Sequence, residues 1–243
     1  MPRALKKIRH FFHRFFFTNY SILLVFLAFL FIFRPYGDRF SHLAVWQAIL
    51  TGAFLCTLLN ANHHRYVRIL ASILAVPTVA LCWIYLFFPL KSIFISNVIL
   101  ITVFLLLVTA SVVYHVVLRA RVTMETLRGV ICAYLMVAIL FAYIYYLIEF
   151  LYPESFHLIK REAVFSYAEY LSELIYFSYS TLLTIGYGDI VPTQHLAQTF
   201  VIIEGIIGQF YIAILVSRLV SVYSLFADKR FIQALENDLG IKK

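Results

Sequence analysis

Long runs of apolar residues, separated by short and mostly basic connections, divide the chain. A helix needs about 20 apolar residues to cross the hydrocarbon core of a membrane, because it rises about 1.5 Å per residue. Six runs reach or approach that length, and together they predict an all-α membrane protein with six transmembrane helices. The runs are 15–33, 41–60, 66–89, 92–118, 129–152 and 195–225.

A seventh apolar run, 171–183, is long enough for a helix but too short to cross a membrane. It leads into the loop Thr181-Leu-Leu-Thr-Ile-Gly-Tyr-Gly-Asp189, in which two glycines stand one residue apart. The run 195–225 then offers a way back across the membrane. The pattern predicts a re-entrant helix and a glycine-containing loop between the fifth and sixth spans.

The chemistry of this loop points to a site for a partly dehydrated cation. Backbone carbonyls that all face one axis can replace the hydration shell of an ion. Gly186 and Gly188 have no Cβ and adopt positive φ at little steric cost, which lets the intervening carbonyls turn to one side. The hydroxyl of Thr184 can add a further oxygen, and Tyr187 can brace the loop through its ring and its phenolic hydroxyl.

The run Tyr176-Phe-Ser-Tyr-Ser-Thr-Leu-Leu-Thr-Ile-Gly-Tyr-Gly-Asp-Ile-Val-Pro192 resembles the pore loop of tetrameric potassium channels, with Ile in the filter. The resemblance extends over 129–225 and implies an outer helix, a pore helix, a filter and an inner helix. It also implies K⁺ as the permeant ion, no cofactor, no catalytic residue and no enzyme activity. Because each chain has one filter, four chains must surround the ion, so we expect a homotetramer with four-fold symmetry.

The site residues follow from this resemblance and from the charge pattern. The carbonyls of Thr184, Ile185, Gly186 and Tyr187 are expected to bind K⁺, with Gly188 and Asp189 at the outer exit. Glu204 is an ionisable residue inside a span, which marks it as a functional candidate. We expect it behind the filter, bonded to the pore helix as a filter support.

In the resembling family a glycine about 24 residues after the filter Thr acts as an inner-helix hinge. Gly208 holds that position and Gly205 lies three residues before it. Close helix packing by small residues is an equally good interpretation. Two departures concern the filter: Leu183 stands where many relatives have a second Thr, and Tyr176-Phe177 replace Trp residues that brace the filter in some relatives.

Lys and Arg residues predict the orientation, because cytoplasmic loops are enriched in them. Fifteen of the 20 fall on the side that holds both termini, and five fall on the other, namely Arg34, Arg39, Lys91, Lys160 and Arg161. We therefore expect a multi-pass protein of the cell membrane with both termini in the cytoplasm. The net charge of +8 is explained by this distribution along membrane flanks, so we expect lipid as a partner and no nucleic acid.

Four regions follow from the pattern. They are an interfacial N-terminal segment (1–19), a four-helix transmembrane domain (20–118), a pore domain (129–225) and a short cytoplasmic tail (226–243). The fourth span contains no Lys, Arg, Asp or Glu from Ser92 to Leu118, so we predict no voltage-sensor gating. Leak-like conduction and gating by lipid, by pH or by the filter itself remain open.

The composition and the single loop limit which other classes of protein fit this sequence. With 63% hydrophobic and 13% charged residues and a mean hydropathy of +0.90, the chain is unlike a soluble domain. A potassium transporter subunit would carry four degenerate loops in one chain, whereas this chain has one intact loop. A nonconducting membrane sensor or regulatory subunit is the other alternative, and ion flux would distinguish it from a channel.

Overall fold

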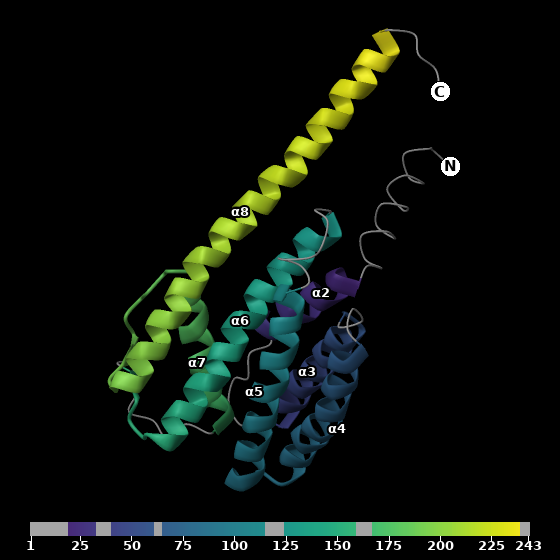
Figure 1. Ribbon diagram of the computed structural model, residues 1–243. Helices are drawn as coiled ribbons and strands as arrows, with labels where there is room; N and C mark the ends of the chain where they lie inside the picture. The colour runs from purple at the N-terminus through teal and green to yellow at the C-terminus, as the bar shows by residue number, and fades with distance from the viewer. Residues whose placement is uncertain (1–18, 33–39, 61–64, 115–123, 159–166, 239–243) are drawn as a thin grey trace.

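The computed structural model describes residues 19–32, 40–60, 65–114, 124–158 and 167–238, and they are mostly helical (Figure 1). The expected interfacial segment 1–19 falls almost wholly outside the described residues. The helices are α2 (Asn19–Ile32), α3 (Phe40–Asn60), α4 (Arg65–Phe87), α5 (Lys91–Val113), α6 (Met124–Leu151), α7 (Tyr167–Leu182) and α8 (His195–Asp238). Two short strands, β1 (Phe156–Leu158) and β2 (Ile190–Pro192), flank α7 in the sequence.

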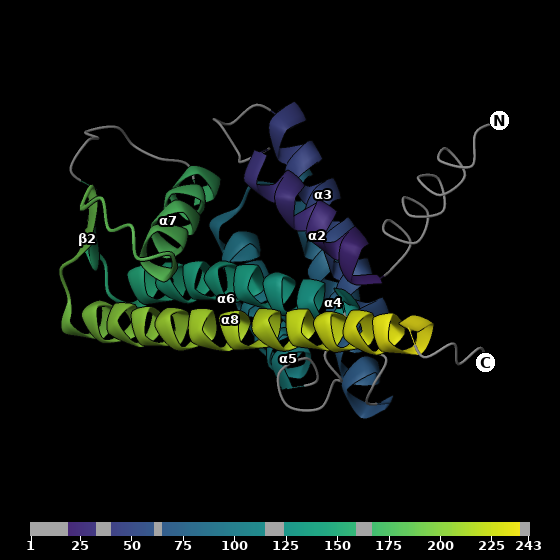
Figure 2. The same cartoon turned by 90° about the horizontal axis from the view of Figure 1, so that it is seen from above.

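Helix α6 joins the two parts of the fold. It packs against α2 and α5 of the N-terminal helices and also against α7 and α8. Of its most apolar segment 78% is buried, against 17% for α8. Figure 2 shows α7, β2 and the beginning of α8 gathered at one end of the molecule, far from the C-terminal end of α8. The region of the predicted loop is therefore held by α6, α7 and α8.

Four helices in the described part of the chain are long and apolar enough to cross a membrane. They lie at Ile69–Phe87, Lys91–Val113, Glu125–Leu151 and His195–Ser217. The apolar stretches described in α2 and α3 are shorter, at Tyr20–Leu30 and Ala44–Ala53. The four long helices indicate an integral membrane protein, and the count of six spans stays a prediction.

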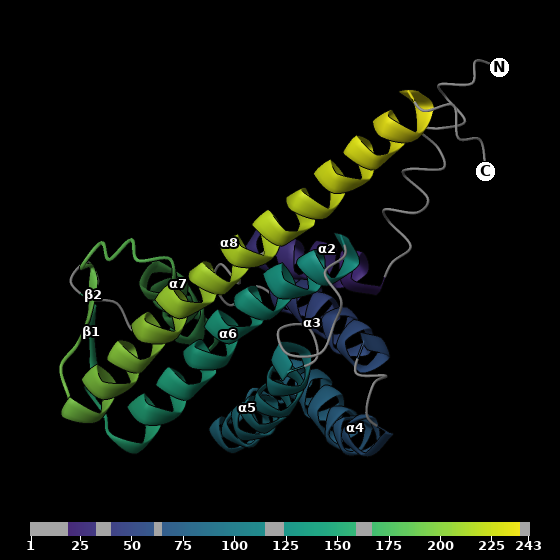
Figure 3. The same ribbon diagram turned by 45° about the horizontal axis from the view of Figure 1, so that its top comes forward.

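Helix α8 is much longer than a membrane crossing requires. Its 44 residues correspond to about 66 Å, roughly twice the hydrocarbon thickness of a bilayer. The helix continues through residue 225, where the apolar run ends, as far as Asp238. Figure 3 shows its C-terminal part extending beyond the other labelled helices. The inner helix of the expected pore domain and the first residues of the expected tail are thus parts of one helix.

A two-stranded antiparallel sheet closes the end of the molecule near the loop (Figure 3). Phe156 pairs with Pro192 and Leu158 with Ile190, so the segment after α6 is tied to the segment after the loop. The carboxylate of Glu149 accepts hydrogen bonds from the backbone N–H groups of Glu154 (3.0 Å) and Phe156 (3.1 Å). These bonds hold the turn that leads into β1.

Candidate functional site

The loop that follows α7 is attached to that helix through its backbone N–H groups. Leu183 N donates to the carbonyl of Tyr179 at 2.9 Å and Thr184 N to that of Thr181 at 2.9 Å. Ile185 N and Gly186 N both donate to Ser180, at 2.8 and 3.3 Å. The loop therefore satisfies three of the last carbonyls of α7, which a helix end otherwise leaves without partners.

These bonds determine which way the loop carbonyls face. In a planar trans peptide, the C=O of one residue and the N–H of the next point in opposite directions. The N–H groups of Thr184, Ile185 and Gly186 point back to α7, so the carbonyls of Leu183, Thr184 and Ile185 point away from it. A row of carbonyl oxygens on the free side of the loop is the result.

The backbone angles extend the same arrangement along the loop. Thr184, Gly186 and Gly188 have positive φ of 58°, 60° and 75°, while Ile185 and Tyr187 between them do not. Alternation of left- and right-handed residues places successive N–H groups on one side of the chain and the carbonyls on the other. Gly186 and Gly188 adopt a positive φ without strain. Thr184 adopts it although a positive φ is unusual for a β-branched residue.

The ring of Tyr176, on α7, supports the outer part of the loop. It is stacked on Tyr187 with a centroid distance of 6.2 Å and an interplanar angle of 8°. Its hydroxyl donates a 2.9 Å hydrogen bond to Oδ2 of Asp189. The neighbouring Phe177 instead contacts Tyr145 and Phe156, each at 5.5 Å. Of the two residues that replace the bracing Trp pair, Tyr176 is thus the one that stacks on the loop and bonds to its outer end.

Glu204 lies completely buried between three helices. Its carboxyl group is hydrogen-bonded to the hydroxyls of Tyr145 on α6 and Ser178 on α7. Ser178 also donates to the carbonyl of Ala138 on α6 at 2.6 Å. Glu204 on α8 is thus connected to both α6 and α7, and its role as a filter support stays a prediction.

The two inner-helix glycines have different surroundings. A Cβ at Gly208 would lie 2.6 Å from the carbonyl oxygen of Leu182, whereas a Cβ at Gly205 would meet nothing within 4 Å. Helix α8 runs through both positions without a break. Close packing is therefore observed at Gly208, and a hinge at either glycine stays a prediction.

The sequence analysis did not single out Tyr134, Tyr145 or Ser178. The hydroxyl of Tyr134 donates to the carbonyl of Leu182 at 2.8 Å, and its ring packs on Tyr211 of α8 at 5.3 Å. The sequence did contain one indication of this. Tyr134 and Tyr145 are eleven residues apart, about three helical turns, and so lie on one face of α6. Hydroxyl groups on one face of an apolar span indicate buried partners.

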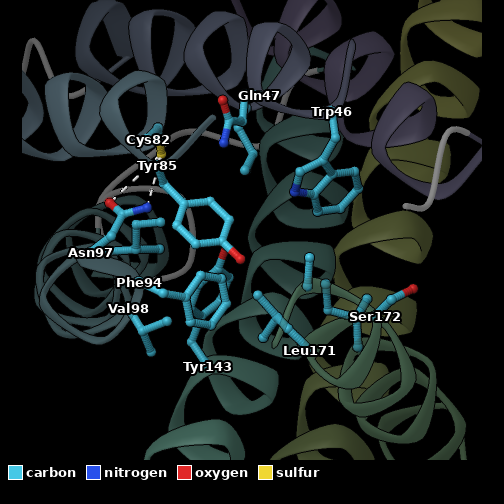
Figure 4. A pocket seen from close by; sticks show the side chains of 14 residues that line it. Trp46, Gln47, Cys82, Tyr85, Phe94, Asn97, Val98, Tyr143, Leu171 and Ser172 are labelled. Atoms are coloured by element: carbon cyan, nitrogen blue, oxygen red, sulfur yellow. Dashed lines mark hydrogen bonds between the residues drawn. The ribbon is translucent and has the colours of Figure 1, made fainter. Parts of the chain in front are cut away.

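A small cavity lies where the N-terminal helices meet α7 (Figure 4). Trp46 and Gln47 of α3 line it from one side, and Leu171 and Ser172 of α7 from the other. Its volume of about 40 Å³ holds a few water molecules at most. Oε1 of the buried Gln47 has no hydrogen-bond partner in the part of the chain that the structure describes. Asn97 and Ser172 also line the cavity, so its walls contain polar as well as apolar side chains.

Comparison with known proteins defines the class of this region. Residues 133–224 match a family model described as ion channel, and this range contains most of α6, all of α7, the loop and the apolar part of α8. No curated protein and no solved structure matches the chain. The match and the four apolar helices together indicate an integral membrane protein with an ion-channel domain.

Proposed function

We propose that this protein is a potassium-selective channel, in which four copies of the chain surround a central pathway and K⁺ flows passively down its gradient. The carbonyls of Thr184, Ile185, Gly186 and Tyr187 bind the ion, and Thr184 adds its hydroxyl. Gly188 and Asp189 form the outer exit. Six spans place both termini in the cytoplasm of a cell whose plasma membrane contains the channel.

The observation that carries this proposal is the direction of the loop carbonyls. Three consecutive N–H groups, those of Thr184, Ile185 and Gly186, are engaged by α7, so the oxygens of the same peptide groups are free on the other side. Carbonyl oxygens presented in a row are the ligands that replace the hydration shell of K⁺. A loop built only to connect two helices has no need of this arrangement.

The exposed surface of the single chain supports assembly. In the single chain, the side chain of Ile185 is 49% exposed and that of Tyr187 is 68% exposed. On α8, the large apolar residues Ile202, Ile206 and Phe210 recur every four residues on one face and are 51–68% exposed. One chain supplies a single wall of the pathway, and neighbouring chains in a tetramer would cover these surfaces.

The proposal is tested by measuring the reversal potential of purified protein in planar bilayers, with K⁺ on one side and Na⁺ on the other. For a K⁺-selective pore, the reversal potential follows the K⁺ gradient by about 59 mV for each tenfold change. Gly186→Asp, which places a side chain and a charge at a positive-φ position, should abolish the selective current.

Val76→Ala is the matched control, because Val76 is 73% exposed on α4, away from the loop. It should conduct as the unmodified protein does, and all three proteins should have the same size in detergent. Absence of current under varied voltage, pH and lipid would contradict the proposal and favour a nonconducting sensor or regulatory subunit. A current that does not distinguish K⁺ from Na⁺ would contradict the proposed selectivity.

A further inference from the structure

The carbonyl of Leu182 differs from the other carbonyls at the end of α7. Those of Tyr179, Ser180 and Thr181 accept hydrogen bonds from the backbone of the loop. Leu182 is fully buried, and its carbonyl accepts from a side chain on another helix, the hydroxyl of Tyr134, at 2.8 Å. This carbonyl belongs to the peptide group between Leu182 and Leu183, two residues before Thr184.

The peptide group between Leu182 and Leu183 is held at both ends. Its N–H donates to Tyr179 at 2.9 Å, and its C=O accepts from Tyr134. Because the peptide unit is planar, two opposed hydrogen bonds prevent its rotation. The next two peptide groups carry the carbonyls of Leu183 and Thr184, so any rotation here would be passed on to the inner end of the filter.

Helix α8 encloses the same carbonyl from another side. The position that a Cβ would take on Gly208 lies 2.6 Å from the oxygen of Leu182. A backbone oxygen at such a distance cannot give way without moving α7, so only glycine permits this approach. The lack of a side chain at position 208 is thus a condition for the contact between α8 and the end of α7.

The side chain of Tyr134 is held in place by its contact with a second tyrosine, on α8. Its ring packs on Tyr211, which is equally buried, and the hydroxyl of Tyr211 donates to the carbonyl of Val130 at 2.8 Å. The two tyrosines differ in what their hydroxyls support. Val130 lies inside α6 and its carbonyl also accepts a helical N–H, whereas Leu182 lies at a helix end.

We propose that Tyr134 and Gly208 clamp the carbonyl of Leu182 and thereby position Thr184, so that they act as positioning residues for ion selectivity at the inner end of the filter. This inference rests on the proposed K⁺ channel function. Without the hydroxyl of Tyr134, the buried carbonyl of Leu182 loses its donor, and the penalty corresponds to about a tenfold change in an equilibrium constant. Rotation of the peptide group toward another donor would relieve this penalty and would displace Thr184.

The test compares Tyr134→Phe with Tyr211→Phe. Both variants remove one hydroxyl from a buried ring and keep the contact between the two rings. We expect Tyr134→Phe to lower the ratio of K⁺ to Na⁺ permeability about tenfold and Tyr211→Phe to leave that ratio unchanged. The ratio is the decisive measurement, since general loss of stability would reduce the number of active channels without changing their selectivity.

Gly208→Ala and Gly205→Ala form a second pair. Both stiffen α8, but only the methyl group added at position 208 would collide with Leu182. The clamp predicts altered selectivity for Gly208→Ala alone, whereas a hinge predicts altered opening in both. If a variant does not assemble by itself, it is measured in mixed channels formed with an excess of unmodified subunits.

Two results separate this inference from the proposed function. If the unmodified protein selects K⁺ and Tyr134→Phe selects it equally well, the clamp is wrong and the channel function stands. Equal losses of selectivity in Tyr134→Phe and Tyr211→Phe would also overturn the clamp, since they would indicate a general effect of the tyrosine pair. An unmodified protein without K⁺ selectivity would overturn both proposals.

Discussion

At the scale of single residues, Glu204 shows how an acidic group is accommodated inside an apolar helix bundle. Ser178 has one hydroxyl proton, and it contacts both the carbonyl of Ala138 and the carboxyl of Glu204. A carbonyl can only accept, so the proton of Ser178 belongs to that bond. A proton on the carboxyl of Glu204 would supply the contact with Ser178, while Tyr145 donates to its other oxygen. We therefore predict that Glu204 is a neutral carboxylic acid.

Glutamine reproduces this pattern, because its amide donates on one side and accepts on the other. We expect Glu204→Gln to keep the stability of the protein within about 1 kcal/mol, and Glu204→Ala to lower it by about 2–4 kcal/mol through a cavity and unpaired hydroxyls. Thermal unfolding of the purified assembly measures both. A large loss for Gln alongside a small one for Ala would show that Glu204 is ionised.

At the scale of elements, the contact between the N-terminal helices and α7 contains a small cavity beside Gln47. A buried amide whose oxygen has no partner among the described residues lowers stability, because it loses its bonds to water. Proteins retain such groups where another property depends on them.

Replacement of Gln47 by Met keeps the length of the side chain and removes its polar atoms. We expect Gln47→Met to raise the stability by about 1 kcal/mol, seen as a higher midpoint of thermal unfolding. Leu50→Ala, in the same helix and also lining the cavity, should lower it, because it removes buried apolar volume. Destabilisation by Gln47→Met would mean that the amide has a partner, such as ordered water, that favours the folded state.

At the scale of the whole molecule, the described helices α2 to α5 precede the ion-channel domain, and they lack the array of charges that a voltage sensor needs. Movement of one charge across the membrane contributes about 2.3 kcal/mol per 100 mV, and the span Ser92–Leu118 has none to move. In the structure, α5 packs on α4 and α6 through buried apolar residues such as Phe104 and Val108. Of these helices, α2 and α5 pack directly on α6, and their role as a scaffold stays a prediction.

The conductance should therefore depend only weakly on voltage. We expect the open probability to change by less than about threefold between −100 and +100 mV, since a larger change needs charge that moves through the field. Single-channel recording in symmetrical K⁺ solutions measures this directly. Steep activation over a few tens of millivolts would contradict the prediction and would direct attention to charges outside the span, such as Arg65 and Arg68.

Much of the architecture was predictable because the constraints are local. Apolar length marks a membrane helix, and the helices begin and end near the predicted runs. The end of α8 was not predictable in this way, since a helix that leaves the membrane no longer needs apolar residues. The positive φ at Gly186 and Gly188 follows from the residue type, but the same angle at Thr184 does not, because β-branched residues avoid it.

Neighbouring residues alone were enough to predict the long apolar helices, the short helix α7 and the glycine-containing loop, since each depends on local properties of the chain. The groups that support that loop became known only from the packing of the helices. The bonds from Tyr134 to Leu182 and from Tyr145 to Glu204 join residues 48 and 59 positions apart. Such pairs depend on how α6, α7 and α8 pack, and a buried hydroxyl has no distinguishing sequence pattern until its partner is known.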